Sequence, residues 1–596
     1  MAEKINLRID NIAVSVDEGS TILEAAKKIN IRIPTLCYHE DLCVAGNCRV
    51  CVVEQAGSDR LLPSCAMPVS EGMEIMTNSL KVRKARKEVI ELLVSEHRAE
   101  CTRCYKNGSC ELQELSSEYI VGENGYIDLI PLKDLTIDHF SPSIIKDDSK
   151  CIRCQRCVRT CSQLQNISAL TVAYKGEEMK ISTFFERPMY EVVCTNCGQC
   201  VNRCPTGALT EKTYLNEVWS AIHAAGKHVV VQTAPAVRIA LGEALGMPPG
   251  EIVTGKLVSA LRRLGFDSVL DTDFTADLTI IEEGNELLQR LKKALVDKDP
   301  TVRLPMTTSC SPGWVKFIEH AFPEYLGNVS TAKSPQQMFG ALAKTFYANK
   351  LDVDPEKMVS VSIMPCTAKK YEAARPEMRS SGYQDVDYVL TTRELALMIK
   401  QAGIDFFSLP DDEYDSIMGE SSGAAVIFGA TGGVMEAALR TAYEVVTGRE
   451  VPFEGLNITP VRGMEYIREA AVKIDNVLPE WSFLEGVELK TCVTHGLSNA
   501  KKVMEAVRDG KADYHFIEVM ACPGGCLGGG GQPIPTSTAI RKRRSEAIYQ
   551  EDSLKPIRKS HENPEVVHIY EEYLKEPLGH KSHELLHTTY KERNRY

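Results

Sequence analysis

The sequence predicts a multidomain protein in which small cysteine-rich α+β segments precede one large α/β domain. A chain of 596 residues is too long to fold around one hydrophobic core, so several domains are expected. Most of the 21 cysteines lie in tight groups, which suit small segments organised around metal. From about residue 216 onward, apolar strand-like runs alternate with helical stretches, as they do in α/β domains.

Composition places the chain among ordinary globular proteins. Hydrophobic residues make up 43% and charged residues 25%, without a low-complexity tract, which excludes a disordered protein. The first ten residues alternate apolar and charged side chains and so predict a strand, not a signal peptide. The sequence contains no run of about eighteen apolar residues that could span a membrane, and the net charge of −12 argues against nucleic-acid binding. We therefore expect a cytoplasmic protein without membrane or nucleic-acid partners, in which grouped cysteines bind metal.

Residues 1–78 form the first predicted domain, with alternating strands and a helical segment from Thr21 to Lys28. Its spacing C-x10-C-x2-C-x13-C is made by Cys37, Cys48, Cys51 and Cys65. This spacing resembles the plant-type ferredoxin loop around a 2Fe-2S cluster. Four thiolates also suit zinc, but the second thiol-rich block that follows favours the cluster. Cys43 lies outside the pattern and is expected to be a free thiol.

Residues 79–120 form a predicted His/Cys cluster segment. A charged helical stretch from Leu80 to His97 leads into the pattern H-x3-C-x2-C-x5-C, whose members are His97, Cys101, Cys104 and Cys110. Three thiolates and one imidazole can hold a 4Fe-4S cube, and the neutral imidazole changes the charge and the reduction potential of the site. A lone histidine is usually a surface or core residue, but ligand spacing beside three cysteines favours ligation.

Residues 141–215 carry two C-x2-C-x2-C-x3-C runs, the pattern of bacterial two-cluster ferredoxins. In that pattern the fourth cysteine of each run ligates the cluster of the other run. One 4Fe-4S cluster would therefore use Cys151, Cys154, Cys157 and Cys204. The other would use Cys194, Cys197, Cys200 and Cys161. The duplication is an internal repeat, which a zinc site would leave unexplained.

Residues 216–540 form the large predicted α/β domain, with strand runs at 229–232, 359–364 and 515–520. Three cysteine loops read Thr308-Ser-Cys-Ser-Pro-Gly-Trp314, Met364-Pro-Cys-Thr-Ala-Lys-Lys370 and Glu518-Val-Met-Ala-Cys-Pro-Gly-Gly-Cys526. Ligand-bearing loops in such domains gather at the carboxyl ends of strands. The three loops resemble the signature motifs of FeFe hydrogenases, and with the upstream cluster motifs the resemblance covers nearly the whole chain.

The resemblance implies an H-cluster, in which a 4Fe-4S cube is joined through a cysteine sulfur to a di-iron unit with carbon monoxide, cyanide and a dithiolate bridge. It implies that Cys366, Cys522 and Cys526 ligate the cube and that Cys526 bridges to the di-iron unit. Thiolates are soft donors that suit this iron. Lys369 would donate to a cyanide, which would compensate its buried charge. Met364 and Met520 would pack against the di-iron unit, with simple core filling as the alternative.

A predicted helix from Asp277 to Leu295 carries Glu283, Glu286 and Arg290 on one face. From the sequence alone, this face reads as a solvated surface with an ion pair. The resemblance instead implies a proton path, in which Ser330 lies between the two glutamates and a cysteine lies nearest the metal.

The first loop departs from the family, which has two adjacent cysteines where this chain has Cys310 and Ser311. In the family the first cysteine passes protons and the second ligates the cube, so Ser311 occupies the place of the ligand. Serine oxygen is a hard donor and a poor substitute for thiolate. Either ligation by Ser311 is unusual or the loop shifts so that Cys310 binds, and completion of the proton path favours Cys310 as the relay.

Other features are interpreted as structural. The segment Gly429 to Gly433 is expected to form a tight turn near the cluster, because the residues of a phosphate-binding loop do not follow it. Cys492 is expected to be a buried thiol. Residues 541–596 are predicted to form a helical tail that wraps around the domain. This tail resembles the small subunit of hydrogenases, and we assign it no chemistry.

Two other classes of protein share part of this pattern. A respiratory electron-transfer subunit would share the amino-terminal pattern but lack the three loops, so Cys366, Cys522 and Cys526 argue against it. An iron-sulfur assembly or sensory relative of hydrogenases would not need the proton path, so the residues of that path favour an enzyme.

The whole pattern resembles catalytic subunits of NAD(P)-linked multisubunit hydrogenases, including electron-bifurcating ones. That resemblance implies one 2Fe-2S cluster, three accessory 4Fe-4S clusters and the H-cluster. It also implies a flavin- and NAD(P)-binding Fe-S subunit, a small 2Fe-2S subunit and ferredoxin as partners, because this chain has no nucleotide-binding motif of its own.

Overall fold

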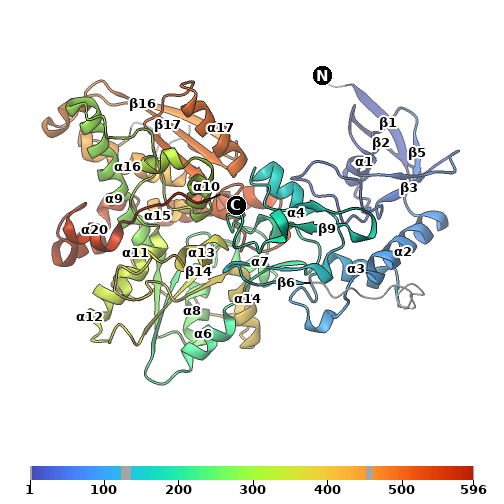
Figure 1. Ribbon diagram of the computed structural model, residues 1–596, viewed down its shortest axis with the longest axis horizontal. Helices are drawn as coiled ribbons and strands as arrows, with labels where there is room; N and C mark the ends of the chain where they lie inside the picture. Colours follow the sequence, from blue (N-terminus) through green and yellow to red (C-terminus); the bar gives the residue numbers. More distant parts are fainter. Residues whose placement is uncertain (1–2, 123–135, 452–460, 595–596) are drawn as a thin grey trace.

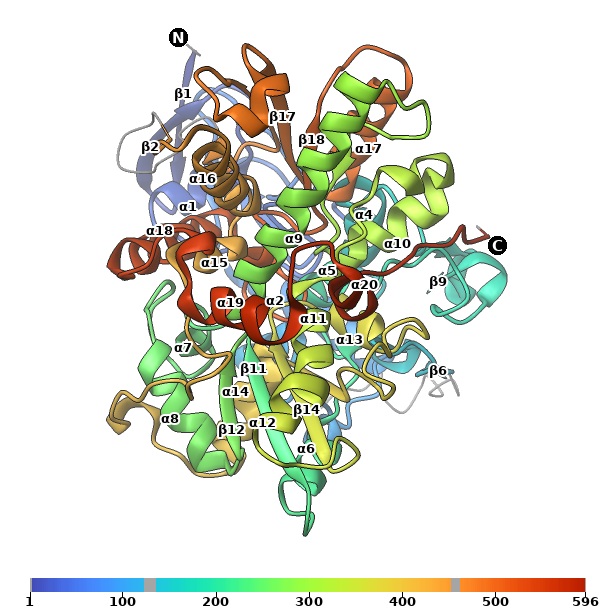
Figure 2. The ribbon, with the colours of Figure 1, turned by 90° about the vertical axis from the view of Figure 1, so that its left-hand side faces the viewer.

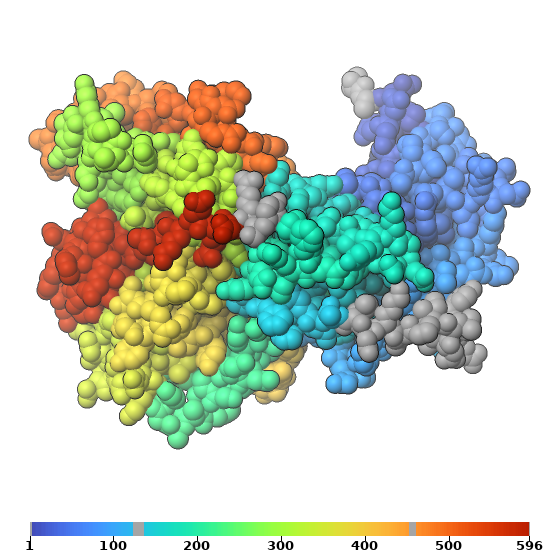
Figure 3. All heavy atoms as spheres, viewed as in Figure 1, coloured from blue at the N-terminus to red at the C-terminus, as the bar shows by residue number. Residues whose placement is uncertain are grey.

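The computed structural model describes residues 3–122, 136–451 and 461–594. The extreme residues of the predicted first domain and of the predicted tail therefore lie outside the described residues. Figure 1 shows an amino-terminal part, blue to teal, on one side of a larger body, green to red. The space-filling view in Figure 3 shows the two parts in direct contact. Within the described ranges, no helix is long and apolar enough to cross a membrane.

The first domain is a five-stranded sheet with one helix packed on it. Its elements are β1 (Lys4–Ile9), β2 (Ile12–Asp17), α1 (Ile22–Lys28), β3 (Val52–Gln55), β4 (Leu61–Pro63) and β5 (Glu74–Met76), in the strand order β2-β1-β5-β3-β4. Thr21 caps α1 and forms a capping box with Glu24, which explains why the helix begins one residue after its predicted start.

Two short units connect this domain to the body. The His/Cys segment consists of α2 (Leu80–Ser95) and α3 (Glu111–Glu118). The next unit consists of a three-stranded sheet, a hairpin and two short helices, each of which follows two cysteines of a run and contains the third. Its elements are β6 (Ile137–Asp138), β7 (Ile144–Asp147), α4 (Arg156–Arg159), β8 (Thr171–Ala173), β9 (Lys180–Ser182), α5 (Gln199–Arg203) and β10 (Leu209–Glu211).

Two four-stranded sheets form the body, in agreement with the α/β prediction. The first sheet is parallel and has the order β12-β11-β14-β15, with bounds β11 (His228–Thr233), β12 (Ser268–Asp271), β14 (Met358–Met364) and β15 (Tyr388–Thr391). The second has the order β13-β18-β17-β16, with bounds β13 (Met306–Thr307), β16 (Ile467–Lys473), β17 (Glu488–His495) and β18 (Phe516–Met520). Only β16 runs antiparallel to its neighbour.

Helices surround and separate the two sheets (Figure 2). Their bounds are α6 (Leu215–Ile222), α7 (Leu241–Ala244), α8 (Thr254–Leu264), α9 (Thr272–Lys292), α10 (Pro312–Ala321), α11 (Pro335–Leu342), α12 (Ala348–Lys350), α13 (Ala368–Ala373), α14 (Thr392–Gln401), α15 (Gly423–Val426), α16 (Gly433–Thr447) and α17 (Leu497–Arg508). The tail adds α18 (Thr538–Leu554), α19 (Pro564–Ile569) and α20 (His580–Leu586). Ser537 caps α18, so the helix begins before residue 541.

The helix α9 is buried between the two sheets. Its Phe274 and Leu278 pack with Val230 of the first sheet, whereas Ile280 packs in a core cluster with Phe516 of the second. The interpretation of its acidic face as solvated is therefore wrong. That face is buried because a second layer, formed from distant parts of the sequence, packs against it.

A buried acidic residue joins the amino-terminal part to the body. Asp41, in the loop after Cys37, accepts hydrogen bonds from Arg203 at 2.6 Å and from Arg541 at 2.9 Å, and its side chain is 9% exposed. Burial alone would raise the pKa of Asp41, but the two guanidinium groups outweigh it and lower the pKa to about 2. One carboxylate therefore holds residues from three distant regions of the chain.

We expect Asp41→Asn to loosen this contact by about 3 kcal/mol, because two buried guanidinium groups lose their charge partner. Hydrogen exchange of the loop around residue 41 and of the first turn of α18 measures the loss as faster exchange in both. In the unaltered protein, the ionised Asp41 carboxylate stabilises the folded state at any pH above its unfolded pKa of about 3.9. This stabilisation is lost as the pH falls towards the folded pKa of about 2.

Asp17→Asn is the matched control, because the ion pair of Asp17 with Lys4 is solvent-exposed. Equal exchange in the Asp41 and Asp17 variants would show that Asp41 does not hold the two parts together.

Candidate active site and cluster sites

Three strands of the two sheets end at one cavity. β13 leads into the loop with Cys310, β14 ends at Met364 just before Cys366, and β18 ends at Met520 just before Cys522. The three loops line the same cavity together with α9 and α11. Parallel strands place their carboxyl ends on one edge, and here the edges of two sheets face each other.

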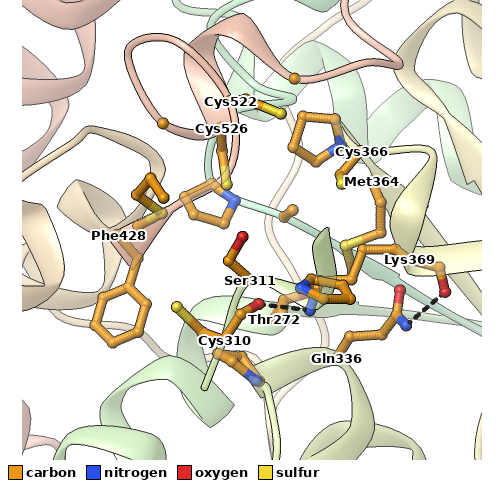
Figure 4. Close-up of a pocket in the computed structure, with 18 of the residues that line it drawn as sticks. Thr272, Cys310, Ser311, Gln336, Met364, Cys366, Lys369, Phe428, Cys522 and Cys526 are labelled. Atoms are coloured by element: carbon orange, nitrogen blue, oxygen red, sulfur yellow. Dashed lines mark hydrogen bonds between the residues drawn. The ribbon is translucent and has the colours of Figure 1, made fainter. Parts of the chain in front are cut away.

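The cavity wall is mostly apolar, with sulfur atoms, one cation and the polar side chains of Thr272, Ser311 and Gln336. Its sulfur-bearing lining residues are Cys310, Met364, Cys366, Met520, Cys522 and Cys526. Ala234, Pro235, Ala276 and Phe428 supply carbon surface, and Lys369 supplies the cation. Figure 4 shows the thiols of Cys366, Cys522 and Cys526 converging on the interior. Three converging thiols in an apolar wall fit a cluster that carries small apolar ligands such as carbon monoxide.

The side chains of Cys310 and Ser311 point in different directions from the loop (Figure 4). The Ser311 hydroxyl accepts a hydrogen bond from the Ala521 N–H at 3.2 Å and points towards Cys522 and Cys526 (Figure 4). The Cys310 sulfur also lines the cavity, below Ser311 in Figure 4, and Cys310 packs against the core of the second sheet. Of the two residues, Ser311 is the one whose side chain points between Cys522 and Cys526.

Lys369 has a protein anion as a partner, which the sequence reasoning missed. Its Nζ donates to the carboxylate of Glu372 at 3.0 Å and to the backbone carbonyl of Cys310 at 3.1 Å. Ser334 and Gln336 also donate to Glu372. The spacing of three residues on one helix was the available signal for this pair.

Four side chains of the predicted proton path lie next to one another: Glu283, Ser330, Glu286 and Arg290. Ser330 donates to Glu286 at 2.8 Å, and Arg290 donates to Glu286 at 2.6 Å. The Ser330 hydroxyl also faces Glu283, which is 2% exposed. Burial, and secondly the charge of Glu286, raise the pKa of Glu283 to about 8.

Glu518, a second buried carboxyl, was not singled out in the sequence. It accepts hydrogen bonds from the N–H groups of Gly432 and Met435 at 2.6 and 2.7 Å, at the start of α16. Gly432 has a φ of 90°, and the turn pairs with the Cys526 loop through an Ala430–Gly525 bridge. The glycine segment is thus a tight turn beside the cavity, as predicted.

The structure gathers the amino-terminal thiols. Cys51 and Cys65 lie 3.3 Å apart, and the Cys37 thiol is within hydrogen-bond reach of Cys48 and Cys65. Cys43 is exposed, and its sulfur accepts a hydrogen bond from Gln163.

The His/Cys segment contains a buried imidazole with an unused nitrogen. Nδ1 of His97 has no hydrogen-bond partner in the described part of the chain. Cys101 and Cys104 both lie close enough to Cys110 to interact with it electrostatically. A buried polar atom without a partner is rare, and a metal would satisfy it.

The two cysteine runs of the next unit are interleaved. One cavity is lined by Cys151, Cys154, Cys157 and Cys204. Cys197 lies beside Cys194 and Cys161, and Cys200 beside the same group. Each set combines three cysteines of one run with the fourth cysteine of the other.

A hydrogen bond from a side chain to the backbone joins this unit to the loop of Cys366. The Thr367 hydroxyl, next to Cys366, donates to the Asn196 carbonyl, next to Cys197, at 2.8 Å. A Cβ on Gly198 would lie 3.0 Å from the Cα of Gly530 and would overlap Thr367. Only glycine allows the two cysteine loops to approach this closely.

Family models match the chain in five places. Residues 227–530 match "Iron only hydrogenase large subunit, C-terminal domain", and residues 538–593 match "Iron hydrogenase small subunit". Residues 2–79 match a 2Fe-2S iron-sulfur cluster binding domain. Residues 86–124 match "NADH-ubiquinone oxidoreductase-G iron-sulfur binding region", and residues 141–210 match "NADH-quinone oxidoreductase subunit 3, ferredoxin-like domain".

Individual relatives cover the whole chain. It is 52% identical to the NADP-reducing hydrogenase subunit HndD of Solidesulfovibrio fructosivorans, over 99% of both chains. It is 41% identical to iron hydrogenase 1 of Clostridium pasteurianum, over 98% of this chain and 99% of that protein. Among solved structures, the [FeFe]-hydrogenase HydA1 of Chlamydomonas reinhardtii matches 64% of this chain and all of its own length, with 43% identity and a TM-score of 0.58.

The full-length relatives, the matched family models and the cavity at three strand ends agree with one another. The chain belongs to the FeFe, or iron-only, hydrogenases.

Proposed function

We propose that this chain interconverts protons and electrons with hydrogen at an H-cluster held in the cavity of Cys366, Cys522 and Cys526. The convergence of these three thiols, with Lys369 beside them and the Glu283 chain leading to them, carries the proposal. When bound, the cluster supplies the iron on which hydrogen is made or split. Cys526 is proposed to bridge the cube and the di-iron unit.

Each remaining side chain has a proposed role in holding the cluster. Lys369, fixed by Glu372, points its ammonium into the cavity as a donor to a cyanide ligand. Met364 and Met520 pack against the di-iron unit. Ser311 takes the fourth ligand position of the cube, because its hydroxyl faces the three thiols.

Protons are proposed to pass through Cys310, Glu283, Ser330 and Glu286 to the surface at Arg290. A carboxyl with a pKa of about 8 can hold and release a proton near neutral pH. The Ser330 hydroxyl can donate and accept at once, so it can connect the two glutamates. Arg290 fixes the outer carboxylate.

Electrons are proposed to reach the cavity through four accessory clusters. One 2Fe-2S cluster lies in a domain of residues 1–78, one 4Fe-4S cluster in residues 79–120 and two in residues 141–215. The hydrogenase domain spans residues 216–540, and residues 541–596 form its small-subunit-like tail. The Thr367–Asn196 contact supports Cys197 as the point of transfer to Cys366.

The proposed partners supply the nucleotide chemistry. The name of HndD describes an NADP-reducing hydrogenase subunit, and this chain is similar to it along its whole length. A flavin- and NAD(P)-binding Fe-S subunit, a small 2Fe-2S subunit and ferredoxin are the proposed redox partners, in the cytoplasm. Purification of the native complex, with identification of its subunits, tests this assembly.

The matured protein should contain about 20 iron atoms per chain, because one 2Fe-2S cluster, three 4Fe-4S clusters and a six-iron H-cluster are proposed. Iron and zinc are measured together by plasma mass spectrometry. Half that iron, with zinc in its place, would contradict the cluster assignment.

His97→Ala should damage one accessory cluster and leave the infrared bands of the H-cluster unchanged, because its proposed ligands are local to residues 97–110. Hydrogen evolution with a small artificial reductant should fall less than coupling to the native donor. Equal loss of both activities would show that this cluster is not an entry point for electrons.

Cys310→Ala should lower turnover by about 100-fold or more, the usual effect of losing a proton-transfer group. The infrared bands of the H-cluster and the paramagnetic signal of its cube should persist, because the proposed ligand is Ser311.

Cys43→Ala is the control, since that thiol is exposed and outside every cysteine pattern. Loss of the cube signal in Cys310→Ala would instead identify Cys310 as a ligand.

A further inference from the structure

The segment that carries Ser330 has little regular structure of its own. Residues 329–334 connect the 3-10 turn at Pro323–Asn328 to α11, and they contain two isolated bridge residues but no strand or helix. Ser330 itself is fully buried, and its N–H donates to the Thr307 carbonyl at 2.8 Å. The polar groups of such a segment need partners from elsewhere in the chain.

The carboxyl-terminal segment supplies these partners. The Tyr590 hydroxyl donates to the Ser330 carbonyl at 2.7 Å. The Thr588 N–H donates to the Thr331 carbonyl at 2.8 Å, and the Leu586 carbonyl accepts from the Lys333 N–H at 2.7 Å. Figure 2 shows this part of the tail, in dark red, crossing the body next to α9 and α11.

Further contacts with the same segment come from His587. Its Nδ1 lies 2.8 Å from the Thr331 hydroxyl, and its backbone forms a bridge with Ala332. Nε2 of His587 lies 3.1 Å from Glu282, the residue of α9 that precedes Glu283. The tail thus contacts both the Ser330 segment and the helix α9, which carries Glu283 and Glu286.

The end of the tail is anchored independently. Arg593 donates from its side chain to the Glu319 carboxylate at 2.6 Å and from its backbone to the Glu319 carbonyl at 2.9 Å. Arg375 donates to the same carboxylate. Tyr590 lies between this anchor and the bridge at His587, so both sides of it are fixed.

We propose that residues 586–593 position the proton relay, with Tyr590 as the residue that fixes the backbone of Ser330. This inference rests on the proposed proton path and assigns a role to a tail that the sequence left without one. The Ser330 side chain reaches Glu286 at 2.8 Å only while its backbone stays in place. Tyr590 and His587 are positioning residues, since neither touches the cavity.

Tyr590→Phe removes one hydroxyl and keeps the ring. We expect kcat for hydrogen evolution and oxidation to fall about three- to tenfold, as expected for the loss of one hydrogen bond that acts on the rate. The solvent deuterium isotope effect on kcat should rise. The KM for hydrogen and the infrared bands of the H-cluster should stay unchanged, because cavity and cluster are untouched.

Tyr573→Phe is the matched control in the same tail. The Tyr573 ring packs on Phe346, and its hydroxyl makes no hydrogen bond to any residue that the structure describes. This variant should keep the kcat and isotope effect of the unaltered protein. A chain ending at Thr589 is the second test variant and should be at least as slow as Tyr590→Phe.

Ser330→Ala separates the inference from the proton path on which it rests. If the tail acts through Ser330, Tyr590→Phe adds no further loss in the Ser330→Ala background. Slow Ser330→Ala beside normal Tyr590→Phe would overturn the inference and leave the path standing. If the losses in kcat of the two single variants multiply in the double variant, the tail acts at another place, and the inference is overturned. Altered infrared bands in Tyr590→Phe would overturn it for the same reason. Normal turnover of Ser330→Ala would remove the path and the inference together.

Discussion

The cysteines of the cavity lie in loops that directly follow strands, so they can meet only where those strands end. In this hydrogenase that constraint applies to two sheets at once. β14 of the first sheet and β13 and β18 of the second direct their carboxyl ends to the same place. The helix α9 fills the space between the sheets, so its acidic face brings Glu283 and Glu286 into a buried layer between apolar cores.

Burial of charge is the second consequence of this architecture. Lys370 pairs with Glu394 inside the first sheet region, and both side chains are fully buried. Arg393, at the start of α14, pairs with Glu211 of β10 and so joins the ferredoxin-like unit to the body. Such pairs contribute little net stability but penalise any arrangement that separates them. They therefore favour one relative placement of the cluster units.

The sequence predicted the fold class, several individual helices and strands, and the cysteine groups. Local patterns were sufficient for this, as the capping box at Thr21 and the strand runs show. The burial of Glu283 could not be predicted from its helix, because the groups that surround it come from other segments, such as Ser309, Ser330 and Glu518. Glu372 was within reach of sequence reasoning through its spacing from Lys369. The contact of Tyr590 with Ser330 spans 260 positions, and no local pattern signals it.

The site residues divide in the same way. Spacing and resemblance named the thiols, and the structure gathers them in the expected groups, while their ligation stays a prediction. The orientation of Ser311 and Cys310 depends on which way a short loop turns, and composition says nothing about that. The structure favours the serine as the neighbour of the three thiols.

The junction between the ferredoxin-like unit and the cavity is built from main chain. Gly198 and Gly530 meet with no side chain between them. Around them, the side chains of Thr367, Gln199 and Asn202 cross the boundary and donate to backbone carbonyls on its other side. A contact of this kind sets the distance between the two cysteine loops through the backbone. An upstream unit that keeps this backbone and the Arg393–Glu211 pair can therefore change elsewhere without changing that distance. Any residue larger than glycine at position 198 or 530 would separate the loops and so lengthen the proposed electron transfer between Cys197 and Cys366.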